Sequence, residues 1–132
     1  MRFDLITIFP KIFNSYLKES ILKRAQKKRL IKITAHNLRD FTADKHHKVD
    51  DRPYGGGPGM VLKIEPIYKA VAKLLRLKLE VRNVQNEQAE RSNKQSDRTT
   101  RTRVILFSTR GKKLDSKMAK RLSKYDQLIL IC

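Results

Sequence analysis

The stretch FDLITIF at residues 3–9 decides the fold of this chain. It is a short apolar run with β-branched residues and a single charge, and Pro10 stops it. Runs of this kind are typical of strands that are buried on both faces, as in the middle of a parallel sheet. We therefore expect residues 3–9 to form a central parallel strand.

The segments on either side of this strand predict helices and strands in alternation. Apolar residues recur at helical spacing over 12–17 and 21–30, as one or two helices with a basic outer side, and again over 64–75, with Pro66 in the first turn. A further helix is expected over 114–125, with Asp115 helping to cap its start, and further strands over 31–38, 104–107 and 128–132. This order predicts an α/β fold with a mostly parallel sheet and flanking helices, and the helix at 64–75 should cover one face of the sheet.

The composition bounds the class of protein. A length of 132 residues fits one domain, and 31 Lys and Arg against 13 Asp and Glu leave a formal charge of +18 that is spread along the chain. Such an excess favours a polyanion as partner, and nucleic acid is the first candidate. The beginning of the chain resembles neither a signal peptide nor a membrane span, and Cys132 is the single cysteine, which fits a reducing compartment. A cytoplasmic location with no membrane association is therefore expected.

Residues 80–102 lack the apolar periodicity of the rest of the chain. They are rich in Asn, Gln, Ser, Thr, Arg and Glu. We expect a flexible insertion here, and its small net charge favours a solvated linker over an RNA-binding arm.

The segment KHHKVDDRPYGGGPGM at residues 45–60 is the main candidate site. Its four glycines, Gly55, Gly56, Gly57 and Gly59, allow backbone conformations with positive φ and can bring N–H groups close to a ligand. No ordinary helix or strand is expected in this segment. The alternative is a mobile surface loop that only connects two elements. The cations of this segment favour a binding site over a connecting loop, because they can contact phosphates. They are Lys45, His46, His47, Lys48 and Arg52.

Several other kinds of site find little support in the sequence. The glycine segment matches neither a P-loop nor a dinucleotide fingerprint, and the three histidines do not have metal-ligand spacing, so no metal is expected. Asp50 and Asp51 could act as a base or hold Mg²⁺, but the neighbouring Lys48 and Arg52 favour pairing that shapes the loop. The turn Ser108–Gly111 could place N–H groups around a small ligand, although many turns from strand to helix look like it.

Four segments together resemble one family. DLITIFPKIF at 4–13, RDFTADKHHKVDDRPYGGGPGM at 39–60, VILFSTRGKKLD at 104–115 and LILIC at 128–132 are similar to the bacterial tRNA (guanine-N1-)-methyltransferases, the TrmD family of the SPOUT class of knotted α/β methyltransferases. The resemblance implies methyl transfer from S-adenosylmethionine to N1 of the guanine 3′ of the anticodon of tRNA. It also implies a homodimer with its active site between subunits, and no binding of DNA is expected.

The resemblance also implies roles for individual residues. Pro58 and Gly59 match positions that line the substrate pocket, and the cations at 45–48 and 52 match positions that contact tRNA. The expected cofactor-binding edge consists of Leu106, Phe107, Ser108, Thr109 and Gly111. Thr109 stands where the family usually has proline, which loosens the turn but leaves its N–H groups in place.

Part of the family pattern is expected beyond Cys132. The family continues after LILIC with a Gly-Arg-Tyr-Glu-Gly loop, the knot, an aspartate proposed as general base and a helical domain that grips tRNA. Residues 1–132 are therefore interpreted as a single incomplete SPOUT domain without its knot, truncated before the catalytic base and inactive alone. A non-catalytic basic RNA-binding module derived from that fold, and a phosphate-binding regulatory domain, remain as alternatives.

Overall fold

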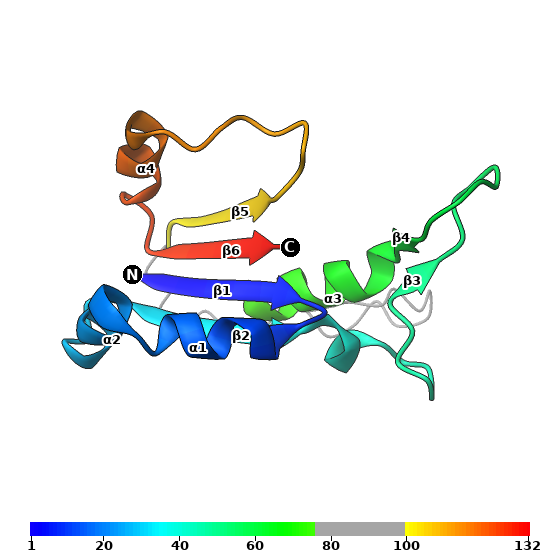
Figure 1. Ribbon diagram of the computed structural model, residues 1–132, viewed down its shortest axis with the longest axis horizontal. Helices are drawn as coiled ribbons and strands as arrows, with labels where there is room; N and C mark the ends of the chain where they lie inside the picture. The colour runs from blue at the N-terminus through cyan, green and yellow to red at the C-terminus, as the bar shows by residue number, and fades with distance from the viewer. Residues whose placement is uncertain (76–99) are drawn as a thin grey trace, which may run out of the picture.

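The structure is a computed structural model that describes residues 1–75 and 100–132. Its main sheet has four parallel strands in the order β2-β1-β6-β5 (Figure 1). These strands are β1 (Arg2–Thr7), β2 (Lys32–Asn37), β5 (Thr102–Leu106) and β6 (Gln127–Ile131). The predicted α/β class, the parallel sheet and the central position of the first strand are confirmed, because β1 pairs with β2 on one side and β6 on the other.

The first strand ends earlier than its apolar run predicts. Strand β1 stops at Thr7, and a short 3-10 helix, η1 (Pro10–Ile12), follows. Proline has no N–H to give to a ladder and its fixed φ suits the first turn of a helix. The N–H of Phe9 instead donates to Oγ1 of Thr7 at 3.2 Å. The chain is therefore already turning away from the sheet at Phe9, which leaves its ring exposed.

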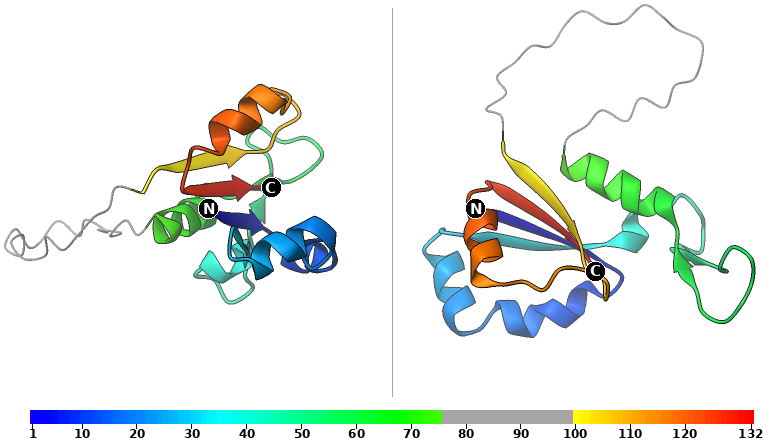
Figure 2. Two further views of the ribbon diagram at one scale, coloured as in Figure 1. Left: turned by 90° about the vertical axis from the view of Figure 1, so that its left-hand side faces the viewer. Right: turned by 90° about the horizontal axis from the view of Figure 1, so that it is seen from above.

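The helices lie on both faces of the sheet in the arrangement that right-handed crossovers require. Helices α1 (Phe13–Leu17) and α2 (Ser20–Lys27) connect β1 to β2, and α4 (Ser116–Leu122) connects β5 to β6. Both connections step across the sheet in the same direction, so these helices share one face. Helix α3 (Ile64–Leu74) belongs to the return from β2 to the far edge strand and lies on the opposite face (Figure 2).

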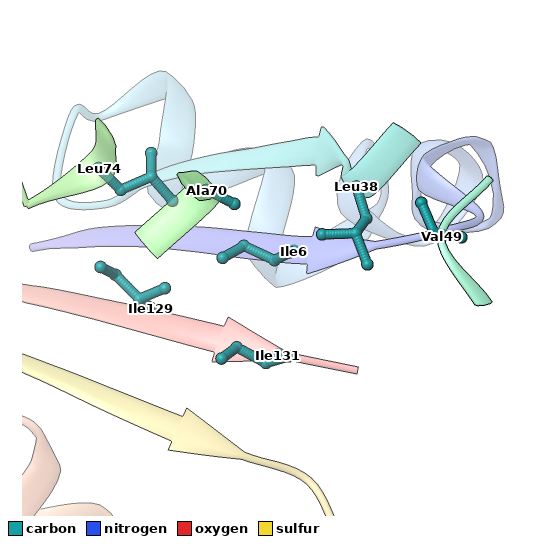
Figure 3. Close-up of a cluster of buried hydrophobic side chains, with 7 residues drawn as sticks. All are labelled: Ile6, Leu38, Val49, Ala70, Leu74, Ile129 and Ile131. Atoms are coloured by element: carbon teal, nitrogen blue, oxygen red, sulfur yellow. The ribbon is translucent and has the colours of Figure 1, made fainter. Parts of the chain in front are cut away.

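The core lies between the sheet and α3, as the sequence predicts. Figure 3 shows Ala70 and Leu74 of α3 over Ile6 and Ile129 of the central strands. Leu38, Val49 and Ile131 complete this cluster, and Val49 holds the chain against the core just before the glycine-rich segment. Burial of large aliphatic side chains from distant segments is the main force that holds α3 on the sheet.

The one or two helices predicted over 12–17 and 21–30 are present as two, α1 and α2, and bury little. Ile12, Tyr16 and Ile21 keep 68%, 72% and 70% of their surface exposed. Within residues 1–75 and 100–132 nothing covers these side chains. Amphipathic periodicity therefore predicted the helices, but it did not predict which apolar side chains find a partner in this part of the chain.

Several boundaries and one expectation need correction. Residues 45–60 do contain a strand: β3 (Asp50–Asp51) pairs antiparallel with β4 (Val61–Leu62). A two-residue strand has no periodicity, so the pattern gave no signal for it. Helix α4 is shorter than predicted, but Asp115 caps it, since Oδ1 accepts from the Met118 N–H at 2.6 Å. Most of the insertion predicted over 80–102 lies outside the described residues.

None of the helices in the described part of the chain has the length and apolar character needed to cross a bilayer.

Candidate functional site

The candidate site lies at the carboxyl edge of the sheet. All four strands of the main sheet run in parallel, so their carboxyl ends meet at one edge. In open α/β sheets, ligands bind outside this edge. The segment after β5 and the segment after β2 both begin there (Figure 1). Together with Leu106, the last residue of β5, they contain every site residue that the sequence predicts.

The segment after β5 begins with a closed turn. The Phe107 N–H donates to the carbonyl oxygen of Ile131 at 3.0 Å, which ties the start of the turn to β6. The carbonyl oxygen of Ser108 then accepts from the Gly111 N–H at 3.0 Å, and its Oγ accepts from the Arg110 N–H at 3.2 Å. The turn therefore stays closed although Thr109 replaces the proline that is usual in the family it resembles.

Gly111 has a steric reason to be glycine. A Cβ built at this position would lie 3.0 Å from the carbonyl oxygen of Ser108, which is closer than ordinary van der Waals contact. A side chain here would push the two ends of the turn apart. Gly111 therefore keeps the turn in its closed shape.

The predicted cofactor residues form one exposed strip at this edge. Leu106 and Phe107 keep 68% and 59% of their surface exposed, and Ser108, Thr109 and Gly111 are exposed as well. Within residues 1–75 and 100–132, no group accepts a hydrogen bond from the N–H of Ser108 or Thr109. The strip thus combines apolar surface with available N–H donors.

The segment after β2 holds His47 in a defined position. The 3-10 helix η2 (Leu38–Phe41) begins it, and His47 adopts a left-handed backbone conformation with φ of 50°. Its Nδ1 lies 3.1 Å from the carbonyl oxygen of Arg39 and 3.1 Å from Oγ1 of Thr42. A carbonyl oxygen only accepts, so the contact with Arg39 places the proton on Nδ1. Nε2 is then left to accept from, or when protonated to donate to, an external group.

Asp44 shapes the same turn. Both of its carboxylate oxygens accept from the Lys48 N–H, at 3.2 and 3.1 Å, and its carbonyl oxygen accepts from the His47 N–H at 3.1 Å. The hydrogen bond from Lys48 lowers the pKa of the Asp44 carboxyl below its ordinary value, so the turn carries a stable negative charge. The side chains of Lys45, His46 and Lys48 remain exposed around it.

The glycine segment forms the loop of the β3–β4 ribbon. Gly55, Gly56, Gly57 and Gly59 all have positive φ, between 81° and 102°, as the sequence predicts. No atom lies within 4 Å of a Cβ built at any of these four positions. The glycines are therefore required by backbone conformation rather than by crowding.

The structure does not join all the predicted residues into one pocket. The loop that carries Pro58 and Gly59 projects beyond the carboxyl edge and away from the sheet (Figure 1). Among the described residues, no hydrogen bond or ion pair connects this loop to the strip at 106–111. The two predicted walls share an edge of the sheet and remain apart.

Comparison with known proteins shows the family of this chain. The sequence profile of the family described as tRNA (Guanine-1)-methyltransferase TrmD matches residues 1–132. The chain belongs to the TrmD family. Curated tRNA (guanine-N(1)-)-methyltransferases from Dictyoglomus turgidum and Dehalococcoides mccartyi are 46% and 41% identical to it over 132 residues, which is all of this chain and 44% and 45% of theirs. This TrmD-family chain thus spans a little under half the length of these relatives.

A solved structure shows the same relationship in three dimensions. The crystal structure of a tRNA (m1G37) methyltransferase from Aquifex aeolicus superposes on this TrmD-family chain with a TM-score of 0.75 and 33% sequence identity. The match covers 100% of this chain and 50% of the other. The fold class predicted from the sequence, the first part of a SPOUT methyltransferase domain, is confirmed.

Sequence reasoning missed the residues that support the TrmD-family loop. Arg39, Thr42 and Asp44 hold His47 and Lys48 through the contacts described above, and Arg39 also donates from its guanidinium to the carbonyl oxygen of His47 at 3.2 Å. The spacing of Asp44 and Lys48 was a usable signal, because Asp often accepts from nearby backbone N–H groups in turns. Nothing in the sequence alone indicated the contact between Thr42 and His47.

Proposed function

We propose that this chain forms part of a tRNA (guanine-N1-)-methyltransferase that transfers a methyl group from S-adenosylmethionine to N1 of the guanine 3′ of the anticodon. The observation that carries the proposal is the match to this family along all 132 residues, with relatives that bear this activity in their names. The location of the predicted residues at the carboxyl edge of a parallel sheet supports it.

The strip after β5 is proposed to bind the cofactor. Exposed Leu106 and Phe107 suit the flat apolar surface of an adenine ring. The N–H groups of Ser108 and Thr109, which donate to no described residue, suit the polar atoms of adenine or of the ribose. When bound, S-adenosylmethionine supplies the methyl group from its sulfonium centre. The role of the strip is to hold and orient the cofactor, and Gly111 keeps the turn in the shape that this requires.

The segment at 45–59 is proposed to meet the tRNA. The exposed side chains of Lys45, His46, Lys48 and Arg52 suit phosphate oxygens, and His47 presents its free Nε2 beside them. Pro58 and Gly59 are proposed to line the pocket for the guanine, where the open backbone of the loop allows close approach.

The reaction needs a group that takes the proton from N1 of guanine. General-base catalysis requires this group within hydrogen-bond reach of the proton. Two of the described carboxylates close to the loop have other partners: Asp44 accepts from the Lys48 N–H, and Asp51 accepts from the Arg52 N–H at 2.8 Å. We propose that the base lies in the part of the relatives that this chain does not match.

The proposed enzyme acts as a homodimer in the cytoplasm, with the pocket completed between subunits. Exposed apolar side chains next to the glycine loop support a covering partner, because such side chains gain stability when they leave water. They are Met60 before β4, Val61 and Leu62 of β4, and Ile64 and Tyr68 of α3. A partner subunit at this position would also contribute residues to the pocket between the strip at 106–111 and the loop that carries Pro58 and Gly59.

A chimera tests the proposal. In it, residues 1–132 replace the matching segment of the Dictyoglomus turgidum relative. We expect the chimera to transfer labelled methyl groups from S-adenosylmethionine to unmodified tRNA, and to produce a primer-extension stop at the guanine 3′ of the anticodon, since a methyl group on N1 blocks base pairing. The 132-residue chain alone is expected to give no transfer.

Two results would decide against parts of the proposal. Transfer by the 132 residues alone would show that the proton acceptor lies within them. A folded chimera that binds tRNA but transfers no methyl group would favour the alternative of a non-catalytic RNA-binding module.

A further inference from the structure

The excess positive charge of this chain is concentrated away from the loop that is proposed to meet the tRNA. Residues 44–52, which include all five predicted tRNA-contacting residues, contain three Lys or Arg and three Asp. With neutral histidines this segment has no formal net charge. The formal charge of +18 must therefore be carried elsewhere.

Helices α2 and α4 and the residues that directly follow them carry a large share of it. Residues 20–29 contain five Lys or Arg, residues 116–125 contain four, and neither segment contains Asp or Glu. We define the amino-edge basic surface by these nine side chains, all of which are exposed: Lys23, Arg24, Lys27, Lys28, Arg29, Lys117, Lys120, Arg121 and Lys124.

The topology places these two groups of cations on one face and at one edge. Helices α2 and α4 lie on the same side of the sheet, opposite α3 (Figure 2). Each is followed by a strand of the parallel sheet, so both end at the edge where the strands begin (Figure 1). Strands β2 and β6 flank β1, so their first residues are about 10 Å apart at the usual strand spacing.

These cations are available to an external anion. The ion pairs of the described residues involve Arg2, His36, Lys69 and Arg101. None of the nine side chains of the amino-edge basic surface forms an ion pair within residues 1–75 and 100–132. Cations in the last turn of a helix interact favourably with its dipole, but Lys23 and Lys117 lie outside the last turns of α2 and α4.

We infer that the amino-edge basic surface binds the phosphate backbone of tRNA, at a distance from the nucleotide that the carboxyl edge is proposed to modify. This inference rests on the proposed function for the identity of the RNA. Nine exposed cations on one face, none of which forms an ion pair with the described residues, suit a polyanion. Contacts with phosphates give affinity and orientation without reading sequence. The loop at 44–52, which has no formal net charge, then positions the target nucleotide, while α2 and α4 supply most of the electrostatic affinity for tRNA.

Two matched triple variants test this assignment. The first, Lys23→Gln, Lys27→Gln and Lys120→Gln, removes three charges from the amino-edge basic surface. The second, Lys63→Gln, Lys69→Gln and Lys73→Gln, removes three charges from α3 and its N-cap on the other face. Glutamine is a good helix former, and the exposed Lys69–Glu65 ion pair that the second variant loses contributes little to stability. Both variants should therefore melt within a few degrees of the wild type, which circular dichroism checks. Binding of unmodified tRNA is then measured over a series of salt concentrations.

For the first variant, the slope of log K against log salt is expected to decrease by about 2, because each lost phosphate contact removes about 0.7–0.9 from it. The second variant should keep the slope of the wild type within about half a unit. If the slope decreases equally in the two variants, the effect is one of net charge alone and the assignment is wrong. An unchanged slope in the first variant would also overturn it.

Other outcomes separate this inference from the proposed function. If the first variant keeps the slope for tRNA but changes its sedimentation coefficient, the surface contacts protein and the inference is wrong, whereas the proposed function stands. If the wild-type chain binds no tRNA at any salt concentration, the inference is wrong, whereas the proposed function is decided by methyl transfer in the chimera.

Discussion

The Asp4 carboxylate on β1 accepts a 2.8 Å hydrogen bond from Nε2 of Gln127 on β6, across 123 positions of sequence. Asp4 is fully buried, and it also contacts Nε2 of His36 at 2.8 Å and a guanidinium nitrogen of Arg2 at 2.9 Å. Thr102 of β5 donates to Oε1 of Gln127 at 3.2 Å. A row of polar side chains thus runs across all four strands of the sheet on the face that α3 covers.

Replacement of Asp4 should destabilise the fold. Asp4→Asn keeps the shape of the side chain but removes the charge that Arg2 and His36 meet. We expect a loss of about 1.5–3 kcal/mol in the free energy of unfolding, the range for hydrogen bonds to charged groups. Urea denaturation measures it. The matched control is Asp126→Asn, which weakens an exposed pair with Arg101 and should cost less than about 1 kcal/mol. Similar losses in both variants would contradict a special role for the buried row.

The stabilising effect of Asp4 should depend on pH. Burial tends to raise the pKa of its carboxyl, but the hydrogen bonds from Arg2, His36 and Gln127 outweigh burial and hold the pKa below the ordinary value of 3.8. A carboxyl with a lowered pKa in the folded state stabilises the fold above its unfolded pKa, and this contribution is lost as the pH falls through the folded pKa. The difference in stability between wild type and Asp4→Asn should therefore be constant above about pH 5 and shrink below about pH 4. A difference that grows on acidification would refute this.

Gly111→Ala should weaken cofactor binding in the chimera. The new Cβ would lie 3.0 Å from the carbonyl oxygen of Ser108, so the backbone of the turn must shift by a few tenths of an ångström. We expect the dissociation constant for S-adenosylmethionine to rise about tenfold, which corresponds to about 1.4 kcal/mol. Isothermal titration calorimetry measures it. Lys112→Ala, at the next exposed position, serves as control and should bind as the unsubstituted chimera does. Unchanged affinity in Gly111→Ala would exclude this turn from the cofactor site.

Lys48→Ala with Arg52→Ala should reduce tRNA binding and its salt dependence. Both side chains are exposed and, among the described residues, form no ion pair. If each meets one phosphate, the slope of log K against log salt should decrease by about 1.5. The control is Lys69→Ala with Lys73→Ala, which removes the same charge from α3 and should leave the slope nearly unchanged. A slope equal to that of the wild type in the first variant counts against a phosphate role for this loop.

Much of the fold follows from local patterns. The apolar run at 3–9 predicted the central strand, helical periodicity predicted α3 and that it covers one face of the sheet, and Asp115 was recognised as a cap. The four glycines at 55–59 were expected to have positive φ because only glycine adopts such angles at no steric cost, and the structure confirms them. These features depend on residues that are neighbours in sequence, so the sequence alone carries their signal.

The remaining features depend on contacts between segments that are distant in sequence. No local pattern places β6 between β1 and β5, brings Gln127 to Asp4, or sets α2 beside α4 on the face opposite α3; pairing order and crossover handedness decide these. The hydrogen bonds of Thr42 and Arg39 with His47 likewise depend on the folded path of the loop, which no local pattern predicts. The sequence by itself determined the elements, the family resemblance and the total charge. Only the tertiary structure decided which polar groups are buried together and where that charge is exposed, because burial and surface are properties of the packed chain.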